Sequence, residues 1–336
     1  MDVLKLLKEL VEIPSPSGKE DEMMDFLCET IQDFGFSPLV FGSETKNVIL
    51  SGKHDFWVVT HMDVVPVDHP FRYDGIFAYG NGVSDAKGSI ASILMALESI
   101  DELNFGVAFL SDEEESGKGS EEFSKKFCGY AVVMEPTGLK IASEHCGSLE
   151  ILFRVEGRAA HASYPEFSIN PVERAFEILE TIKKMDLKSS VKMIRAGDER
   201  HVIPESCEMN LEIILRPEES PSEILERLKR ELKGYGEMKV LEMSSGFIES
   251  DFEILKRAIE KSGMRAEFTT MQSWTDAINL RRGGWRTVVW GPGELCYAHT
   301  KYERIRLKEI VKAGEVLIAL NELLSNFPKS LFSSQT

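Results

Sequence analysis

The segment Phe56-Trp57-Val58-Val59-Thr60-His61-Met62-Asp63 predicts a buried strand that ends in two polar side chains. Its first five residues form a mainly apolar run, of the length that is typical of a strand inside a sheet. His61 and Asp63 follow at alternate positions, so both side chains leave the strand on the same side. The aspartate can accept a hydrogen bond from the second imidazole nitrogen and fix the histidine tautomer. A surface His-x-Asp is common, so this segment alone indicates little about function.

Residues 105–110 and 131–134 are two more apolar runs that predict buried strands ending in carboxylates. The first leads into Asp112-Glu113-Glu114-Glu115, and the second leads into Glu135. Because these strands alternate with predicted helices such as 88–100, they indicate an α/β fold with a mostly parallel sheet and flanking helices. Ligands of such sheets gather beyond the carboxyl ends of the strands. We therefore expect these polar side chains to share one crevice.

Two further candidate ligands lie in glycine-rich segments. Asp85 follows Gly80-Asn81-Gly82-Val83-Ser84, and His299 ends the loop 291–299, which follows a predicted strand at 287–290. Neutral imidazole and carboxylate suit Zn²⁺ and its divalent neighbours. The chain offers six such groups, which is more than one mononuclear site needs. They are His61, Asp85, Glu113, Glu114, Glu135 and His299. This order predicts a two-metal hydrolytic centre with a spare carboxylate for proton transfer.

Each of these motifs also has a structural interpretation. The turn before Asp85 fails as a phosphate-binding loop, because Lys87 has no Ser or Thr after it and the glycine spacing is wrong. The acidic run at 112–115 would ordinarily be a solvated surface. His54, His69 and His145 lack a comparable context, so we expect them to be structural or surface residues.

Composition excludes several classes of protein. The chain has 336 residues, a net charge of −17, 43% hydrophobic residues and 28% charged residues. That charge argues against nucleic acid and against an anionic membrane as partner, since both need a basic surface. No apolar run approaches membrane-spanning length, and the N-terminus does not resemble a signal peptide. Five scattered cysteines form neither a disulfide framework nor a zinc motif, which favours the cytoplasm.

The length and a change of pattern predict two domains. Residues 147–246 alternate in the order strand, helix, strand, strand, helix, strand, which is the ferredoxin-like split arrangement. This small domain is therefore predicted to be inserted into a discontinuous catalytic domain formed by 1–146 and 247–336. Ser17 and Glu20 resemble a capping box for a helix over 19–34. The polar tail from Pro328 to Thr336 is expected to fray.

These motifs, in this order, resemble the di-zinc metallopeptidase family of aminoacylases, acetylornithine deacetylase, succinyl-diaminopimelate desuccinylase and glutamate carboxypeptidase. The resemblance spans essentially the whole chain and includes Ile13-Pro14-Ser15-Pro16-Ser17-Gly18 and Gly157-Arg158-Ala159-Ala160-His161-Ala162-Ser163. The segment Gly291-Pro292-Gly293 and the short length are most similar to hydrolases of lysine and ornithine biosynthesis. Those enzymes free an amino acid from an acetyl group or from an amino-group carrier protein.

The resemblance implies a role for each candidate residue. One metal, Zn²⁺ or alternatively Co²⁺, would be held by His61, Asp85 and Glu135, and the other by Asp85, Glu114 and His299. Glu113 would be the general base that takes a proton from a metal-activated bridging water and then the general acid. Asp63 would orient His61. A cis peptide is implied between Asp85 and Ala86.

Within the inserted domain, the resemblance implies a lid and dimerisation role. His161 resembles a lid histidine that reaches the neighbouring subunit's site, so a homodimer through this domain is implied, although a plain loop histidine is the alternative. Arg216 resembles an arginine suited to a substrate α-carboxylate. The chain departs from the family pattern at Asn81, at His201 and at Trp274. His201 and Trp274 are expected to line the substrate pocket.

The expected function is removal of an N-acyl group, acetyl or carrier glutamyl, from an amino acid such as lysine or ornithine in lysine or arginine biosynthesis. A dipeptidase or carboxypeptidase with the same chemistry is the alternative, and a catalytically silent paralogue is a third. The intact ligand set and Glu113 argue against the third. A charge of −17 would repel an acidic carrier unless a local basic surface offsets it.

Overall fold

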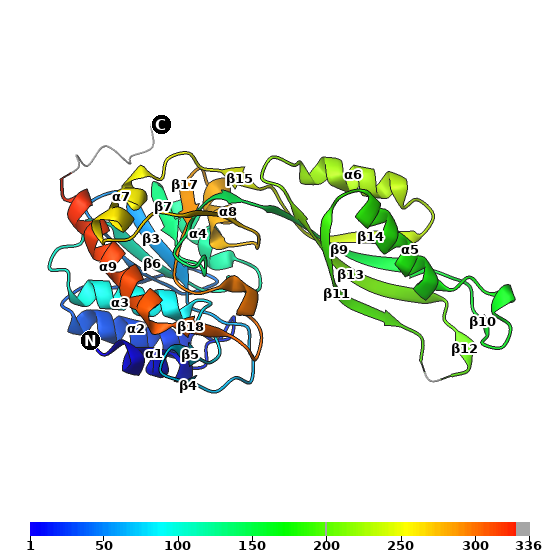
Figure 1. The fold of residues 1–336 in the computed structure, drawn as a ribbon, viewed down its shortest axis with the longest axis horizontal. Helices are drawn as coiled ribbons and strands as arrows, with labels where there is room; N and C mark the ends of the chain where they lie inside the picture. The colour runs from blue at the N-terminus through cyan, green and yellow to red at the C-terminus, as the bar shows by residue number, and fades with distance from the viewer. Residues whose placement is uncertain (199, 327–336) are drawn as a thin grey trace. The chain divides into compact units, whose positions relative to one another are not determined.

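The computed structural model describes residues 1–198 and 200–326, which divide into two compact units (Figure 1). The predicted fraying of the tail after Pro328 concerns residues outside this described part. Within the described part, the first unit consists of Met1–Ser143, Glu249–Met271 and residues 275–326, and the second consists of Glu144–Ile248 and Gln272–Trp274. In the described part, no helix is both long and apolar enough to cross a membrane.

A mixed sheet forms the centre of the first unit. Its strand order is β1 (Leu39–Phe41), β2 (Asn47–Leu50), β6 (Gly106–Leu110), β3 (Phe56–His61), β7 (Tyr130–Val133), β17 (Arg286–Val289) and β8 (Ile141–His145), with β16 (Phe268–Met271) paired to β8. β15 (Phe247–Ile248) pairs with the last residues of β8. Strands β6, β3, β7 and β17 run parallel, whereas the outer pairs are antiparallel. The α/β prediction is therefore confirmed, with the parallel arrangement restricted to the middle of the sheet.

Helices cover both faces of this sheet, which explains why β3 is apolar at almost every position. Val58 belongs to the core that includes the helices of one face, where α3 packs against α1 and α9. Trp57, the residue before Val58, points to the other face and packs against Phe123 of α4 and against Trp285. The helices are α1 (Val3–Glu12), α2 (Asp21–Asp33), α3 (Lys87–Glu98), α4 (Lys118–Lys126), α7 (Glu253–Lys261), α8 (Asp276–Arg282) and α9 (Leu307–Leu324).

A small three-stranded sheet in the first unit escaped the sequence analysis. Its order is β18 (Arg304–Arg306), β5 (Phe77–Tyr79) and β4 (Arg72–Tyr73). Strands of two or three residues are too short to show a period, so their sequence gave no indication of them. β5 leads directly into the turn before Asp85, and β18 begins five residues after His299.

The second unit contains a four-stranded antiparallel sheet with two helices. The strand order is β11 (Lys188–Ala196), β13 (Ser206–Leu215), β9 (Gly147–Glu156) and β14 (Gly236–Ser244). Helix α5 (Pro171–Lys184) packs on β9, β11 and β13, while α6 (Pro221–Glu231) packs on β9 and β14. The chain order of these elements is the split β-α-β-β-α-β order expected for residues 147–246. A short pair, β10 (Ala160–His161) and β12 (Val202–Ile203), lies at one end of the sheet (Figure 1).

The predicted capping box at the start of α2 is wrong. Helix α2 begins at Asp21, and its N-cap residue Glu20 makes no capping hydrogen bond with its side chain. The hydroxyl of Ser17 instead donates to Oδ2 of Asp63 at 2.7 Å. The Glu20 carboxylate accepts a hydrogen bond from the backbone N of Asp112 at 3.2 Å. Tertiary partners have therefore taken both side chains that a local cap would have used.

Candidate metal centre

Parallel strands deliver the candidate ligands to one edge of the central sheet. His61 is the last residue of β3 and lies opposite Leu110, the last residue of β6, beyond which come Glu113 and Glu114. Glu135 follows the next parallel strand, β7. Because the carboxyl ends of parallel neighbours meet at the same edge, these polar side chains gather there as expected.

Asp85 lies at the centre of the cluster, between two histidines. Its Oδ1 is 3.1 Å from Nε2 of His61, and its Oδ2 is 3.3 Å from Nε2 of His299. The same His299 nitrogen is 2.9 Å from Oε1 of Glu114. Ligand atoms of His61, Asp85 and Glu114 all lie within 4.8 Å of one another. The predicted cis peptide between Asp85 and Ala86 is present.

Glu135 approaches the cluster at His61. Its Oε2 lies 3.8 Å from Nε2 of His61, and the residue is only 2% exposed. Its Oε1 is buried and has no hydrogen-bond partner among the described residues. A buried carboxylate oxygen without a partner is costly, unless a cation takes up its charge. This oxygen therefore fits a metal ligand.

Asp63 is the residue that shapes the Glu113–Glu114 turn. Its Oδ1 accepts a hydrogen bond from the backbone N of Glu113 at 3.1 Å, and its Oδ2 accepts one from that of Glu114 at 3.0 Å. Nδ1 of His61 lies 2.9 Å from the backbone carbonyl O of Asp63 and 3.5 Å from its Oδ1. The shorter contact to the carbonyl orients the imidazole so that Nε2 faces Asp85. The carboxylate thus has a larger part in holding the acidic turn than the sequence suggested.

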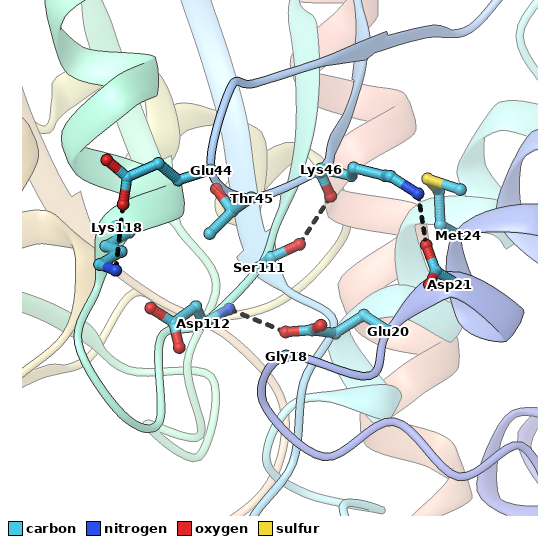
Figure 2. Close-up of a pocket in the computed structure, with 10 residues that line it drawn as sticks. All are labelled: Gly18, Glu20, Asp21, Met24, Glu44, Thr45, Lys46, Ser111, Asp112 and Lys118. Atoms are coloured by element: carbon cyan, nitrogen blue, oxygen red, sulfur yellow. Dashed lines mark hydrogen bonds and ion pairs between the residues drawn. The ribbon is translucent and has the colours of Figure 1, made fainter.

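The two residues before this turn, Ser111 and Asp112, line a polar cavity of about 280 Å³ (Figure 2). Figure 2 shows Glu20 hydrogen-bonded to the backbone N of Asp112, the residue that precedes Glu113. Lys46 and Lys118 on the cavity wall each pair with a carboxylate of the same wall. Both lysines are therefore neutralised by neighbouring carboxylates, and the hydrogen bond to Glu20 holds the chain just before the turn.

Crowding of charge shifts the pKa of the clustered groups. Burial raises the pKa of Glu113 and of Glu135 well above the usual carboxyl range, and neighbouring carboxylates raise both further. Burial also raises the pKa of Asp85, but hydrogen bonds from His299 and His61 outweigh it and hold the pKa below its usual range. Hydrogen bonds to Asp85 and to Glu114 raise the pKa of His299 to about 10. So many buried carboxylates in contact need compensating positive charge, which divalent cations would supply.

The structure places the predicted residues of the inserted domain in the second unit. The rings of His161 and His201 lie 5.1 Å apart at the β10–β12 end, and both side chains are exposed. Arg216 follows the other end of β13, where it pairs with Asp186 at 3.3 Å on the wall of a cavity of about 390 Å³. Trp274, half-buried, belongs to the short segment that groups with this unit.

Two functional candidates were missed by the sequence analysis. Asp276 at the start of α8 is fully buried, and burial raises its pKa to about 7. Glu303 is buried and accepts hydrogen bonds from the loop that carries Asp85. Neither carboxylate directly follows an apolar run, so the signal that identified His61 and Glu135 is absent at both positions. For Glu303, the sequence pattern that could have indicated a role is its spacing of four residues from His299.

Comparisons with known proteins agree with this geometry. A family model described as peptidase family M20/M25/M40 matches residues 57–322. A LysW-lysine/LysW-ornithine hydrolase of Sulfurisphaera tokodaii is 27% identical over 96% of this chain and 95% of its own length. A Pyrobaculum aerophilum protein, with the same designation marked as provisional, is 28% identical over 98% of this chain and 100% of its own. The solved structure of a tripeptidase from Staphylococcus aureus has a TM-score of 0.80 at 18% identity, covering 97% of this chain and 98% of that one.

Proposed function

The chain belongs to peptidase family M20/M25/M40, and on that premise we propose that it is an amidohydrolase that removes an N-acyl group from an amino acid. The observation that carries the proposal is the single carboxylate of Asp85 placed between His61 and His299, with Glu113 on the neighbouring turn. Two-metal hydrolases use a shared carboxylate of this kind. The reaction would cleave a linear amide bond.

We assign the first metal position to His61, Asp85 and Glu135 and the second to Asp85, Glu114 and His299. Imidazole nitrogen with carboxylate oxygen is the donor set that suits Zn²⁺ and, as an alternative, Co²⁺. The unpartnered Oε1 of Glu135 supports the first assignment. The 2.9 Å approach of His299 to Glu114 supports the second.

Bound metals would supply an activated water and polarise the scissile carbonyl. Glu113 would accept a proton from the attacking water and then return it to the leaving amine, the task of a general base and general acid. Asp63 holds Glu113 for this task through the hydrogen bond to its backbone N. His61 is held in turn by the backbone carbonyl of Asp63, which fixes Nε2 toward Asp85.

The two lid residues lie too far apart within one subunit to hold one small substrate. His161 pairs with Val202 beside the start of β13, whereas Arg216 follows the end of β13. A strand of 10 residues spans roughly 30 Å, which is several times the length of an acylated amino acid. If both side chains contact substrate, they serve two different sites. This separation supports a homodimer in which His161 acts in the partner's site and Arg216 binds the substrate carboxylate.

An acidic carrier would need a basic surface on this chain, and the small sheet of the first unit offers one. This basic surface consists of Arg72 and Arg306, which are both exposed; Nε of Arg306 lies 4.0 Å from Oε1 of Glu309. The Arg72 guanidinium lies 3.4 Å from the ring centroid of Tyr79, and that of Arg306 lies 5.1 Å from the ring centroid of Phe77. Strand β5, which supplies both rings, ends six residues before Asp85 and so within about 20 Å of it. This basic surface favours lysine or ornithine attached to a carrier protein, the substrate that the designation of the archaeal relatives indicates.

Peptide-bond hydrolysis is the second candidate. A relative from Aspergillus clavatus, 27% identical over 94% of this chain, carries a carboxypeptidase designation. The metal assignment would be unchanged, and only the leaving group and the pocket would differ. His201 and Trp274 are part of the proposal as pocket residues. His201 lies beside His161 and so would line the partner's pocket, whereas Trp274 would line the pocket of its own subunit.

A substrate panel tests the proposed function. Purified protein reconstituted with Zn²⁺ or Co²⁺ would be offered N-acetyl-lysine, N-acetyl-ornithine, N-succinyl-diaminopimelate, a dipeptide and carrier-linked lysine. The proposal expects metal-dependent release of lysine or ornithine, abolished by a chelator and restored by added metal. Activity on the dipeptide alone would demote the acyl-amino-acid assignment, and no metal-dependent activity would support a catalytically silent protein.

A further inference from the structure

Glu303 is a buried carboxylate for which the proposed reaction has no use. It is 1% exposed, and it stands four residues after His299, directly before β18. A buried carboxylate without partners is strongly unfavourable, so the surrounding structure must supply hydrogen bonds to retain it.

Three backbone amides of the Asp85 loop provide those hydrogen bonds. Oε2 of Glu303 accepts from the backbone N of Gly82 at 2.9 Å. Oε1 accepts from that of Ser84 at 2.8 Å and from that of Asp85 at 3.1 Å. Successive backbone N–H groups that converge on one anion hold a loop in a single conformation. The Glu303 carboxylate therefore fixes the chain as far as the backbone of Asp85 itself.

This arrangement ties together two segments that are far apart in sequence and that each carry a proposed ligand. Glu303 belongs to the loop of His299, and its carboxylate holds the loop of Asp85. A second and weaker link connects the same segments, since the backbone N of Glu294 donates to Oγ of Ser84 at 3.0 Å. The position of Asp85 relative to His299 thus depends mainly on the charged interaction.

We propose that Glu303 is a positioning residue that sets the affinity of the second metal position, the one formed by Asp85, Glu114 and His299. This inference rests on the metal assignment of the proposed function. Two of these three ligands lie on the segments that Glu303 joins. The first position depends on it less, because its other ligands, His61 and Glu135, follow strands of the central sheet.

The inference is tested by measuring the metal affinity of the Glu303→Ala and Glu303→Gln variants, which does not require an activity assay. Stripped protein would be titrated with Zn²⁺, and bound metal per subunit would be measured by mass spectrometry after removal of free ion. We expect the first equivalent to bind as in the wild type. The second equivalent should bind about 10–100-fold more weakly in Glu303→Ala, the effect usual for groups that orient ligands. Glu303→Gln retains a carbonyl oxygen, so its affinity for the second equivalent should lie between that of the wild type and that of Glu303→Ala.

Glu249→Gln is the matched control. Glu249 is also a buried carboxylate of the first unit, 5% exposed. It accepts a hydrogen bond from the backbone N of Asp251 at 2.9 Å and pairs with Arg281 at 3.0 Å and Arg286 at 3.6 Å, and none of these partners is a proposed metal ligand. Its substitution should lower the melting temperature and leave both metal affinities unchanged. The comparison separates a general loss of stability from a specific loss of metal.

Several outcomes would overturn the inference. Wild-type affinity for both equivalents in folded Glu303→Ala would do so, as would equal metal loss in Glu249→Gln. If Glu303→Ala does not fold, Glu303→Gln with two wild-type affinities would be decisive against it. A wild-type protein that binds one equivalent or none would refute the two-metal assignment, and the inference with it. Two wild-type equivalents without hydrolysis of any substrate would contradict only the proposed function.

Discussion

Oδ2 of Asp85 lies 3.3 Å from Nε2 of His299, and the other oxygen of the same carboxylate contacts His61. The two histidines come from segments more than 200 residues apart, on the end of β3 and on the loop after β17. A single carboxylate with one histidine at each oxygen is the arrangement that a bridging ligand requires. The proposed assignments of the other residues all depend on this relationship.

Asp85→Asn should weaken both metal positions at once. The amide keeps the shape of the side chain, but it removes the negative charge and replaces one ligand oxygen with an NH₂ group. Glu114→Gln is the matched comparison, because it should weaken the second position alone. The measurement is bound metal per subunit at limiting Zn²⁺, and full retention of both equivalents by Asp85→Asn would rule out the bridge.

Asp63→Asn should lower kcat more than it raises KM. The amide can accept one of the two backbone hydrogen bonds of the Glu113–Glu114 turn, but its NH₂ group faces the other donor. We expect a loss of about 10–100-fold in kcat with metal content largely retained. Ser17→Ala removes only the hydroxyl donor to Asp63 and should have a smaller effect. Equal losses in the two variants would show that Asp63 does not act through the turn.

Exposed arginines near the metal centre should matter for a carrier-linked substrate alone. Arg72→Glu and Arg306→Glu reverse the charge of the basic surface without touching a proposed ligand. We expect each to raise KM for carrier-linked lysine several-fold, more strongly at low ionic strength, and to leave KM for N-acetyl-lysine unchanged. Arg257→Glu on the exposed side of α7 is the control. An unchanged KM for the carrier-linked substrate would remove this surface from the proposal.

Stability of the second unit should fall below neutral pH because of His145. This side chain is buried, and burial lowers its pKa from 6.5 to about 4. Between these values the unfolded chain binds a proton that the folded chain does not. The contribution of His145 is therefore complete above pH 6.5 and is lost as the pH falls toward 4.

A buffer series of denaturant titrations measures this effect. His145→Phe retains a ring against Phe247, whose centroid lies 5.1 Å away, but it cannot titrate. Its free energy of unfolding should depend less on pH between 6.5 and 4, by up to about 1.4 kcal/mol per pH unit. His201→Phe, at an exposed histidine of the same unit, should leave the dependence unchanged. Parallel curves for wild type and His145→Phe would contradict the account.

The ends of the long strands made most of the cluster predictable from the sequence. His61 and Glu135 follow apolar runs whose length and β-branched composition favour buried strands, and parallel pairing then brings those ends together. The split order of the inserted domain was predictable for the same reason, because each of its elements is long enough to show its period.

Contacts between distant segments were not predictable. The backbone N of Glu113 meets Asp63 across 50 positions, and Glu303 meets Asp85 across 218. No local pattern encodes such a pair, since the hydrogen bond forms only after the sheet has assembled. Ser17 is an example. Its hydroxyl suits a helix cap, yet in the folded chain it donates a hydrogen bond to Asp63.

The most direct test of the central claim is the turnover of Glu113→Gln at known metal content, on the best substrate of the panel. Glutamine keeps the shape of the side chain but cannot accept and return a proton. The account predicts wild-type metal content with a loss of about 10²–10⁴-fold in kcat, the range typical of general acid–base groups. Hydrolysis near the wild-type rate by the metal-replete variant would contradict it.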